Sequence, residues 1–176
     1  ERITLLMDPT SRNGNLLLNF PLPSSGMPDA EELKILDEIT KWMAVNSEAI
    51  YGTRPWKTFG SGPATDVTIE ARPGSSEHHQ AAAFNERNRK PLSARDVRYT
   101  KKGPVLFAFA MGWPDGAAMF RELALGGAQG ARKIQRVQLL GHKGDVKWTQ
   151  DANGLKVQMP PQKPCDHAIA LRIEGA

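Results

Sequence analysis

A short apolar segment near the start of the chain, followed by an amphipathic helix, limits the possible folds more than any other feature. Residues 15–20 read Asn-Leu-Leu-Leu-Asn-Phe and follow the turn sequence Asn13-Gly14, in which glycine readily adopts a positive φ. Pro21 and Pro23 come directly afterwards, and proline cannot continue a strand ladder. An apolar run without polar alternation is typical of a strand buried on both faces of a parallel sheet. We therefore predict a buried strand over residues 15–20.

The residues after Pro28 predict an amphipathic helix that closes at Asn46-Ser47. Proline suits the first helical position, and the acidic side chains that follow it complement the positive end of the helix dipole. These acidic residues are Asp29, Glu31 and Glu32. Apolar residues recur every three or four positions and form one stripe, which is expected to face a sheet. The stripe consists of Leu33, Leu36, Ile39 (or Ile35), Trp42 and Met43. One strand and one helix cannot bury either of their faces alone.

Beyond residue 60 the hydrophobic period changes to two residues, and short strands alternate with turns. Leu155, Val157 and Met159 show this alternation cleanly. Seven or eight such strands predict an antiparallel β-sandwich. The expected strands are residues 66–70, 96–100, 105–111, 119–125, 134–140, 146–149, 155–159 and 168–173. The side chains expected to point into the sandwich are Val105, Phe107, Phe109, Leu123, Leu125, Val137, Leu139, Leu155, Val157, Ile169, Leu171 and Ile173.

Several motifs spread over most of the chain occur in an order typical of one enzyme family. They are Asn-Gly-Asn-Leu-Leu-Leu-Asn at residues 13–19, Glu-Ala-Ile-Tyr-Gly-Thr-Arg-Pro-Trp at 48–56, Asp-Val-Arg-Tyr-Thr-Lys-Lys-Gly at 96–103, Gly-Trp-Pro at 112–114, Val-Gln-Leu-Leu-Gly at 137–141 and Lys-Pro-Cys at 163–165. Together they strongly resemble the end of the catalytic barrel and the C-terminal domain of retaining α-L-fucosidases (glycoside hydrolase family twenty-nine). The chain departs from the family pattern at Pro21, Ser47 and Ser61, which affects local loop shapes.

The resemblance implies a mainly β chain in two parts. Residues 1–59 would be the incomplete C-terminal end of a β/α barrel catalytic domain, with its last strand and helix, and residues 60–176 a β-sandwich domain. Residues 1–7 fit this interpretation as the tail of an amphipathic helix, which Pro9 is expected to end near Asp8. We interpret the chain as the C-terminal part of a longer enzyme, for which the resemblance implies a secreted, periplasmic or lysosomal location.

The resemblance also implies the chemistry of the parent enzyme. Retaining fucosidases of this type use an Asp nucleophile and a second carboxylic acid as acid/base, with the two carboxyl groups roughly 5–5.5 Å apart. Both groups would lie upstream of Glu1, so no catalytic residue is expected in this chain, and the chain alone is expected to be inactive. The parent's substrate would be a fucosylated glycan or oligosaccharide. The remainder of the barrel, or another copy of the chain, would cover the strand and helix.

Phe20 is the candidate substrate contact. If residues 15–20 form a barrel strand, Phe20 lies at its C-terminal end, the face where barrel active sites are built. An apolar side chain there would pack against the C6 methyl group of a fucosyl ring. Phe20 would equally well close the mouth of the barrel without touching substrate.

Composition and single residues add no further chemistry. The chain of 176 residues has a net charge of +4, and no apolar run approaches the roughly 18 residues of a membrane span. The basic run at residues 87–98 lacks an aromatic platform or motif for nucleic acid. His78-His79 is expected to be exposed rather than a metal site, and no cofactor is expected. Cys165, two residues before His167, is expected to be a buried inert thiol rather than a nucleophile.

Two alternatives stand beside the hydrolase interpretation. One is an autonomous carbohydrate-binding sandwich, and the other is a structural or interaction domain of a fucosidase-like protein that has lost its activity. A binding module would need a row of exposed aromatic side chains. Trp113 and Trp148 are the only tryptophans in the expected sandwich, which is too few for a convincing platform.

Overall fold

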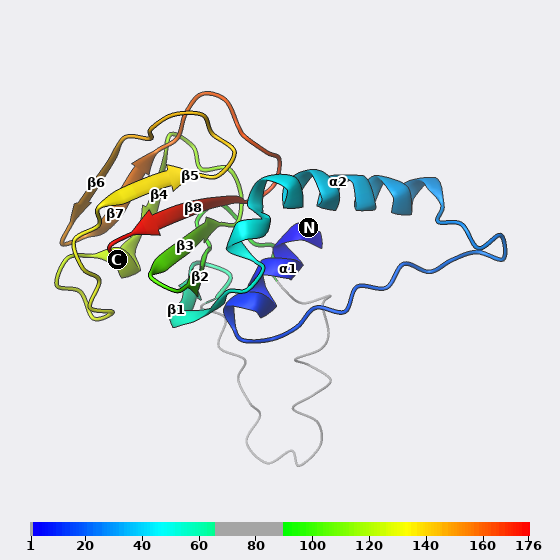
Figure 1. Ribbon diagram of the computed structural model, residues 1–176, viewed down its shortest axis with the longest axis horizontal. Coiled ribbons are helices and arrows are strands. Elements are labelled where there is room, and N and C mark those ends of the chain that lie inside the picture. The colour runs from blue at the N-terminus through cyan, green and yellow to red at the C-terminus, as the bar shows by residue number, and fades with distance from the viewer. Residues whose placement is uncertain (1, 66–89) are drawn as a thin grey trace, which may run out of the picture.

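The computed structural model describes residues 2–65 and 90–176 and contains two antiparallel sheets, with helices against the outer face of the larger one (Figure 1). The helices are α1 (Arg2–Ser11), α2 (Ala30–Asn46) and the short 3-10 helices η1 (Ser47–Ala49) and η3 (Arg121–Leu123). The strands are β1 (Arg54–Ser61), β2 (Val97–Lys102), β3 (Val105–Ala110), β4 (Ala117–Phe120), β5 (Arg136–Leu139), β6 (Trp148–Asp151), β7 (Gly154–Gln158) and β8 (Ile169–Glu174). The predicted fold class, mainly β with an antiparallel sandwich, is confirmed.

The sheets have the strand orders β1-β2-β3-β8-β5 and β4-β7-β6, and all their strand pairs are antiparallel. The predicted hairpin is present as β2 and β3, in which Lys102 pairs with Val105 across a turn that holds Gly103 at φ 56°. The strand expected at residues 66–70 lies outside the described residues. The predicted domain boundary between residues 59 and 60 falls within β1 and stays a prediction.

Helix α2 ends where the sequence predicts, but it begins at Ala30, with Asp29 as the N-cap, so Pro28 lies before the helix and not at its first position. The Asp29 side chain accepts hydrogen bonds from the backbone N–H groups of Glu31 and Glu32, at 3.0 and 2.9 Å. The Glu32 carboxylate in turn accepts from the Asp29 N–H at 3.3 Å. This capping box satisfies donors that the first helical turn leaves free. Ser47 forms the C-cap.

Helix α1 continues past Pro9 to Ser11, so the prediction that it ends near Asp8 is wrong. Pro9 lies in the last turn, where its missing N–H removes only one helical hydrogen bond. Hydroxyl groups support this turn: Thr10 donates to the Leu6 carbonyl and Ser11 to the Asp8 carbonyl, both at 2.7 Å.

Residues 15–20 do not form a strand in this structure, unlike the sequence prediction. The segment is irregular, and Leu17 is 87% exposed. A strand of a parallel sheet forms its hydrogen bonds only with neighbouring strands. Within the described part of the chain, all strands belong to the two antiparallel sheets, so the segment has no ladder to join.

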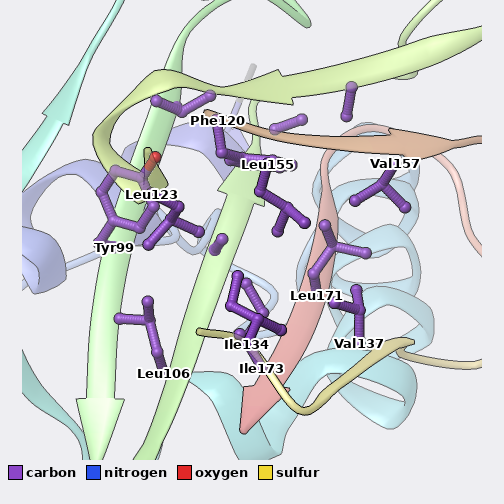
Figure 2. Packing of buried hydrophobic residues seen from close by; sticks show 14 of the residues in the cluster. Tyr99, Leu106, Phe120, Leu123, Ile134, Val137, Leu155, Val157, Leu171 and Ile173 are labelled. Carbon is purple, nitrogen blue, oxygen red and sulfur yellow. The ribbon is translucent and has the colours of Figure 1, made fainter. Parts of the chain in front are cut away.

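The main hydrophobic core lies between the two sheets (Figure 2). It contains most of the side chains predicted to point inward: Leu123, Val137, Leu139, Leu155, Val157, Ile169, Leu171 and Ile173. Tyr99, Phe120 and Leu106 complete the packing that Figure 2 shows. Leu125 is an exception, because it lies after η3 outside any strand and is 40% exposed.

A second core lies between the larger sheet and the helices, and it corrects the expected direction of three side chains. Phe107 and Phe109 are fully buried in it, and Val105 packs against it, whereas all three were predicted to face the sandwich interior. Strand β3 is central and covered on both faces, so its neighbours Leu106, Ala108 and Ala110 fill the other core instead. The second core also contains Ile3, Met7, Trp42, Ala49, Ile50, Met111, Ala168 and Ala170.

Candidate functional site

Phe20, the predicted substrate contact, lies in the irregular segment between α1 and α2, where it is half-buried and its neighbour Asn19 is exposed. The segment leaves α1 through a tight turn: the Gly14 N–H donates to the Pro9 carbonyl at 2.8 Å, and Asn13 has φ 65°. Figure 1 shows the segment running to the far end of α2, away from the two sheets. The substrate-binding role of Phe20 stays a prediction.

A buried ion pair connects the C-terminal end of α1 to the larger sheet. The segment that contains Phe20 starts from this end of α1. The Arg98 guanidinium on β2 contacts Asp8 on α1 with Nε–Oδ1 at 2.5 Å, and its side chain is only 2% exposed. Arg98 also donates to the carbonyls of Val97, at 2.8 Å, and Ser61, at 3.3 Å. Asp8 receives a second contact from Arg12 at 3.3 Å, whose guanidinium stacks 3.7 Å above the Phe59 ring.

The charges around Asp8 keep it ionised. Burial by itself raises the pKa of an aspartate, but the positive charges and hydrogen bonds of Arg98 and Arg12 outweigh burial and lower the pKa of Asp8 below its usual value. The sequence pattern gives no sign of this pair, because its members lie 90 positions apart in the chain. The basic run at residues 87–98 ends at Arg98, but it does not indicate which carboxylate Arg98 contacts. Arg98 belongs to the motif at residues 96–103, but the motif does not name its partner.

Three carboxylates at the start of α2 or on it have structural partners that account for them. Asp29 caps the helix, Asp37 pairs with Lys41 at 2.6 Å, and Glu38 lies 3.3 Å from the imidazole of His167. In residues 2–65 and 90–176, no group of three or more His, Cys, Asp or Glu side chains is placed to hold a metal ion. His78 and His79 lie outside the described residues.

Cys165 is less buried than the sequence predicts, and its lack of reactivity stays a prediction. It is half-buried, its sulfur accepts a hydrogen bond from Asn46 Nδ2 at 3.4 Å, and it donates to the Ala168 carbonyl at 3.5 Å. Burial raises the pKa of this thiol, and the nearby charge of Asp166 acts in the same direction, although the Asn46 hydrogen bond opposes them. His167 contacts Glu38.

The tryptophans of the sandwich do not form a sugar-binding platform. Trp113 and Trp148 both pack against the inter-sheet core and are partly buried. The ammonium group of Lys163 lies 5.8 Å from the centroid of the Trp113 ring. A carbohydrate-binding module based on these two rings therefore has no support from the geometry.

Comparison with known proteins matches both parts of the chain to the same kind of enzyme. Residues 1–48 match the family described as Alpha-L-fucosidase, and residues 90–174 match the Alpha-L-fucosidase C-terminal domain. The chain belongs to the α-L-fucosidase family. The tissue alpha-L-fucosidase of Homo sapiens is 25% identical over 99% of the chain, and the alpha-L-fucosidase of Branchiostoma floridae is 28% identical over 99%.

Solved fucosidase structures share the fold of this family member. The Thermotoga maritima alpha-fucosidase in complex with fucose has a TM-score of 0.65 at 19% identity, with 98% of this chain and 33% of that one covered. Alpha-L-fucosidase isoenzyme 1 from Paenibacillus thiaminolyticus has a TM-score of 0.63 at 21% identity, with the same coverage of 98% and 33%. The chain spans about a third of the length of its curated relatives, 31% of the human protein and 32% of the Branchiostoma protein. Among the described residues, no helix is long and apolar enough to cross a membrane.

Proposed function

We propose that this chain is part of an α-L-fucosidase-like glycoside hydrolase that releases terminal α-L-fucose with retention of configuration. The observation that carries the proposal is the joint match of residues 1–48 and 90–174 to the two successive parts of one enzyme family. The helices α1 and α2 are packed on the sandwich through a shared core, so the sandwich supports the segment that leads to Phe20.

The catalytic carboxyl groups come from outside this chain in our proposal. A retaining mechanism needs a nucleophile and an acid/base carboxyl roughly 5–5.5 Å apart and both open to substrate. In α1 and α2, however, Asp8 is engaged by two arginines, and Asp29 and Glu32 form the capping box. Asp37 and Glu38 contact Lys41 and His167 on the exposed surface. These contacts explain these five carboxylates without any catalytic role.

Phe20 supplies an apolar contact for the sugar in this proposal. Fucose carries a methyl group at C6, and a phenyl ring is a suitable apolar surface for it. In the complete enzyme, residues 15–20 would join the barrel sheet, and the exposed Leu16 and Leu17 would then be covered by the rest of the barrel. Phe20→Ala in the complete enzyme would raise KM for an aryl α-L-fucoside more than it lowers kcat.

The purified chain is expected to show no turnover of an aryl α-L-fucoside, because in our proposal the paired carboxyl groups come from outside it. Continuous release of the aryl group by this chain, at a rate that survives repeated purification, would contradict the prediction. The complete enzyme should release α-L-fucose as the first-formed anomer. Proton NMR during the first minutes of the reaction reports that anomer, and release of the β-anomer would exclude the retaining mechanism.

A further inference from the structure

A groove of about 710 Å³ crosses one end of the sandwich. Its lining includes Trp56 on β1, Lys101 on β2 and the β2–β3 turn. Arg132, in the loop before β5, and Leu106 on β3 also line it. Figure 2 shows Leu106 near the same end of the core as Ile134 and Ile173.

Lys57 connects β1, which carries Trp56, to the loop that carries Arg132. Its ammonium group donates a hydrogen bond to the Gln129 carbonyl at 2.9 Å, which holds the loop at residues 126–132 against β1. The groove is therefore formed by a fastened loop and a sheet edge, rather than by a gap between independent surfaces.

The lining of the groove is strongly cationic. Four cationic residues line it: Lys57, Lys101, Arg132 and Arg172. Among the described residues that line the groove, Glu174 is the one acidic residue. Glu174 is already engaged by Arg172, which also contacts Glu48 at 3.3 Å. In the described part of the chain neither Lys101 nor Arg132 has an ion-pair partner, and both residues are exposed. An anion entering the groove would meet two cationic side chains that are free to contact it.

The number of aromatic rings in the groove helps to decide which class of anionic ligand fits it. Trp56 lines the groove and is half-buried, with its ring 5.1 Å from that of Tyr99 behind it. Proteins that hold single-stranded nucleic acid stack successive bases on several rings, and this groove offers a single ring among its described residues. One supported ring beside polar donors suits the mixed apolar and polar surface of a sugar.

We propose that this groove binds an anionic glycan, with Lys101 and Arg132 contacting its sulfate or carboxylate groups and Trp56 packing against a sugar ring. The proposed glycan binding uses residues of this chain alone and does not depend on fucoside hydrolysis. If the proposed hydrolase function fails, the groove is still testable, and loss of glycan binding would leave the hydrolase proposal intact.

The test is a titration of the chain with oligosaccharides of equal length and different charge. A chondroitin sulfate hexasaccharide supplies sulfate and carboxylate, a hyaluronan hexasaccharide supplies carboxylate alone, and a chitin hexasaccharide is neutral. We expect binding of one or both anionic sugars, weakening with added salt, and none of the neutral sugar. The NMR signal of the Trp56 indole N–H should shift on binding, whereas that of buried Trp42, which is bonded to the Ala168 carbonyl, should not.

The variant Lys101→Gln/Arg132→Gln should raise the Kd of the bound sugar about tenfold. Its matched control, Lys143→Gln/Lys156→Gln, removes the same charge at exposed positions outside the groove and should change the Kd less than twofold. Circular dichroism establishes that both variants are folded. Equal weakening by both variants, equally tight binding of a uridine hexanucleotide, or no binding of either anionic sugar would overturn the proposal.

Discussion

At the scale of single residues, the Asp8–Arg98 pair is the ion pair whose loss should matter most. Asp8→Asn would leave the Arg98 guanidinium buried without a counter-charge. We expect it to lower the free energy of unfolding by about 3 kcal/mol, near the lower end for breaking a buried pair, because Asp8 keeps some contact with water. Urea unfolding followed by tryptophan fluorescence measures this change. The control is Asp37→Asn, which breaks an exposed ion pair and should cost less than about 1 kcal/mol.

The same pair predicts a pH dependence with a definite sign. The folded-state pKa of Asp8 is lowered, so its contribution to stability is present above the unfolded-state pKa of about 3.9. That contribution is lost as the pH falls below this value toward the folded-state pKa, because the unfolded chain then binds the proton more readily. Unfolding free energies measured between pH 6 and acidic pH should fall less steeply for Asp8→Asn than for the unaltered chain. Parallel curves would show that another group carries the dependence.

At the scale of elements, strand β3 joins the two halves of the chain through its two faces. Phe107 is fully buried between the sheet and the helices, so Phe107→Ala should lower the free energy of unfolding by about 3–5 kcal/mol. It should also increase hydrogen exchange at the Trp42 indole, since that side chain packs in the same core. Phe20→Ala should leave the stability unchanged. If Phe20→Ala destabilises the chain as much as Phe107→Ala does, residue 20 belongs to the shared core. If the Trp42 indole N–H stays protected from hydrogen exchange in Phe107→Ala, the packing of the helices does not depend on Phe107.

The sequence predicts these elements well where the signal is local. The β2–β3 hairpin follows from a glycine turn between two apolar segments, and helix α2 follows from its acidic first turn and apolar stripe. The sequence does not predict which face of the sheet the Phe107 side chain lies on, because residues 105–111 are apolar throughout and show no alternation. The irregular course of residues 15–20 does not follow either, because a parallel strand depends on neighbours distant in sequence. Contacts such as Asp8–Arg98 are beyond local patterns for the same reason.

At the scale of the whole molecule, an apolar surface is left uncovered along α2 and the segment before it. Trp42 is buried, and Ile39 and Met43 pack on the second core, but Leu33 in the same stripe is 50% exposed. Figure 1 shows why: the N-terminal half of α2 extends beyond the sheets. Leu17, Leu22 and Met27 are also exposed. Large apolar side chains exposed along one segment and the helix that follows it favour association with a covering surface.

We therefore expect the isolated chain to associate with itself through this surface, where the rest of a barrel would pack in the complete enzyme. Sedimentation velocity over a range of concentrations should show dimers or larger species whose fraction rises with concentration. Leu17→Ser/Leu33→Ser should shift the equilibrium toward monomer, because burial of each leucine stabilises association by roughly 1.5–3 kcal/mol. Met119→Ser/Leu125→Ser removes two exposed apolar side chains elsewhere on the molecule and should leave the equilibrium unchanged. A chain that stays monomeric at all concentrations, with α2 protected from hydrogen exchange along its whole length, would show that the surface is stable without a cover.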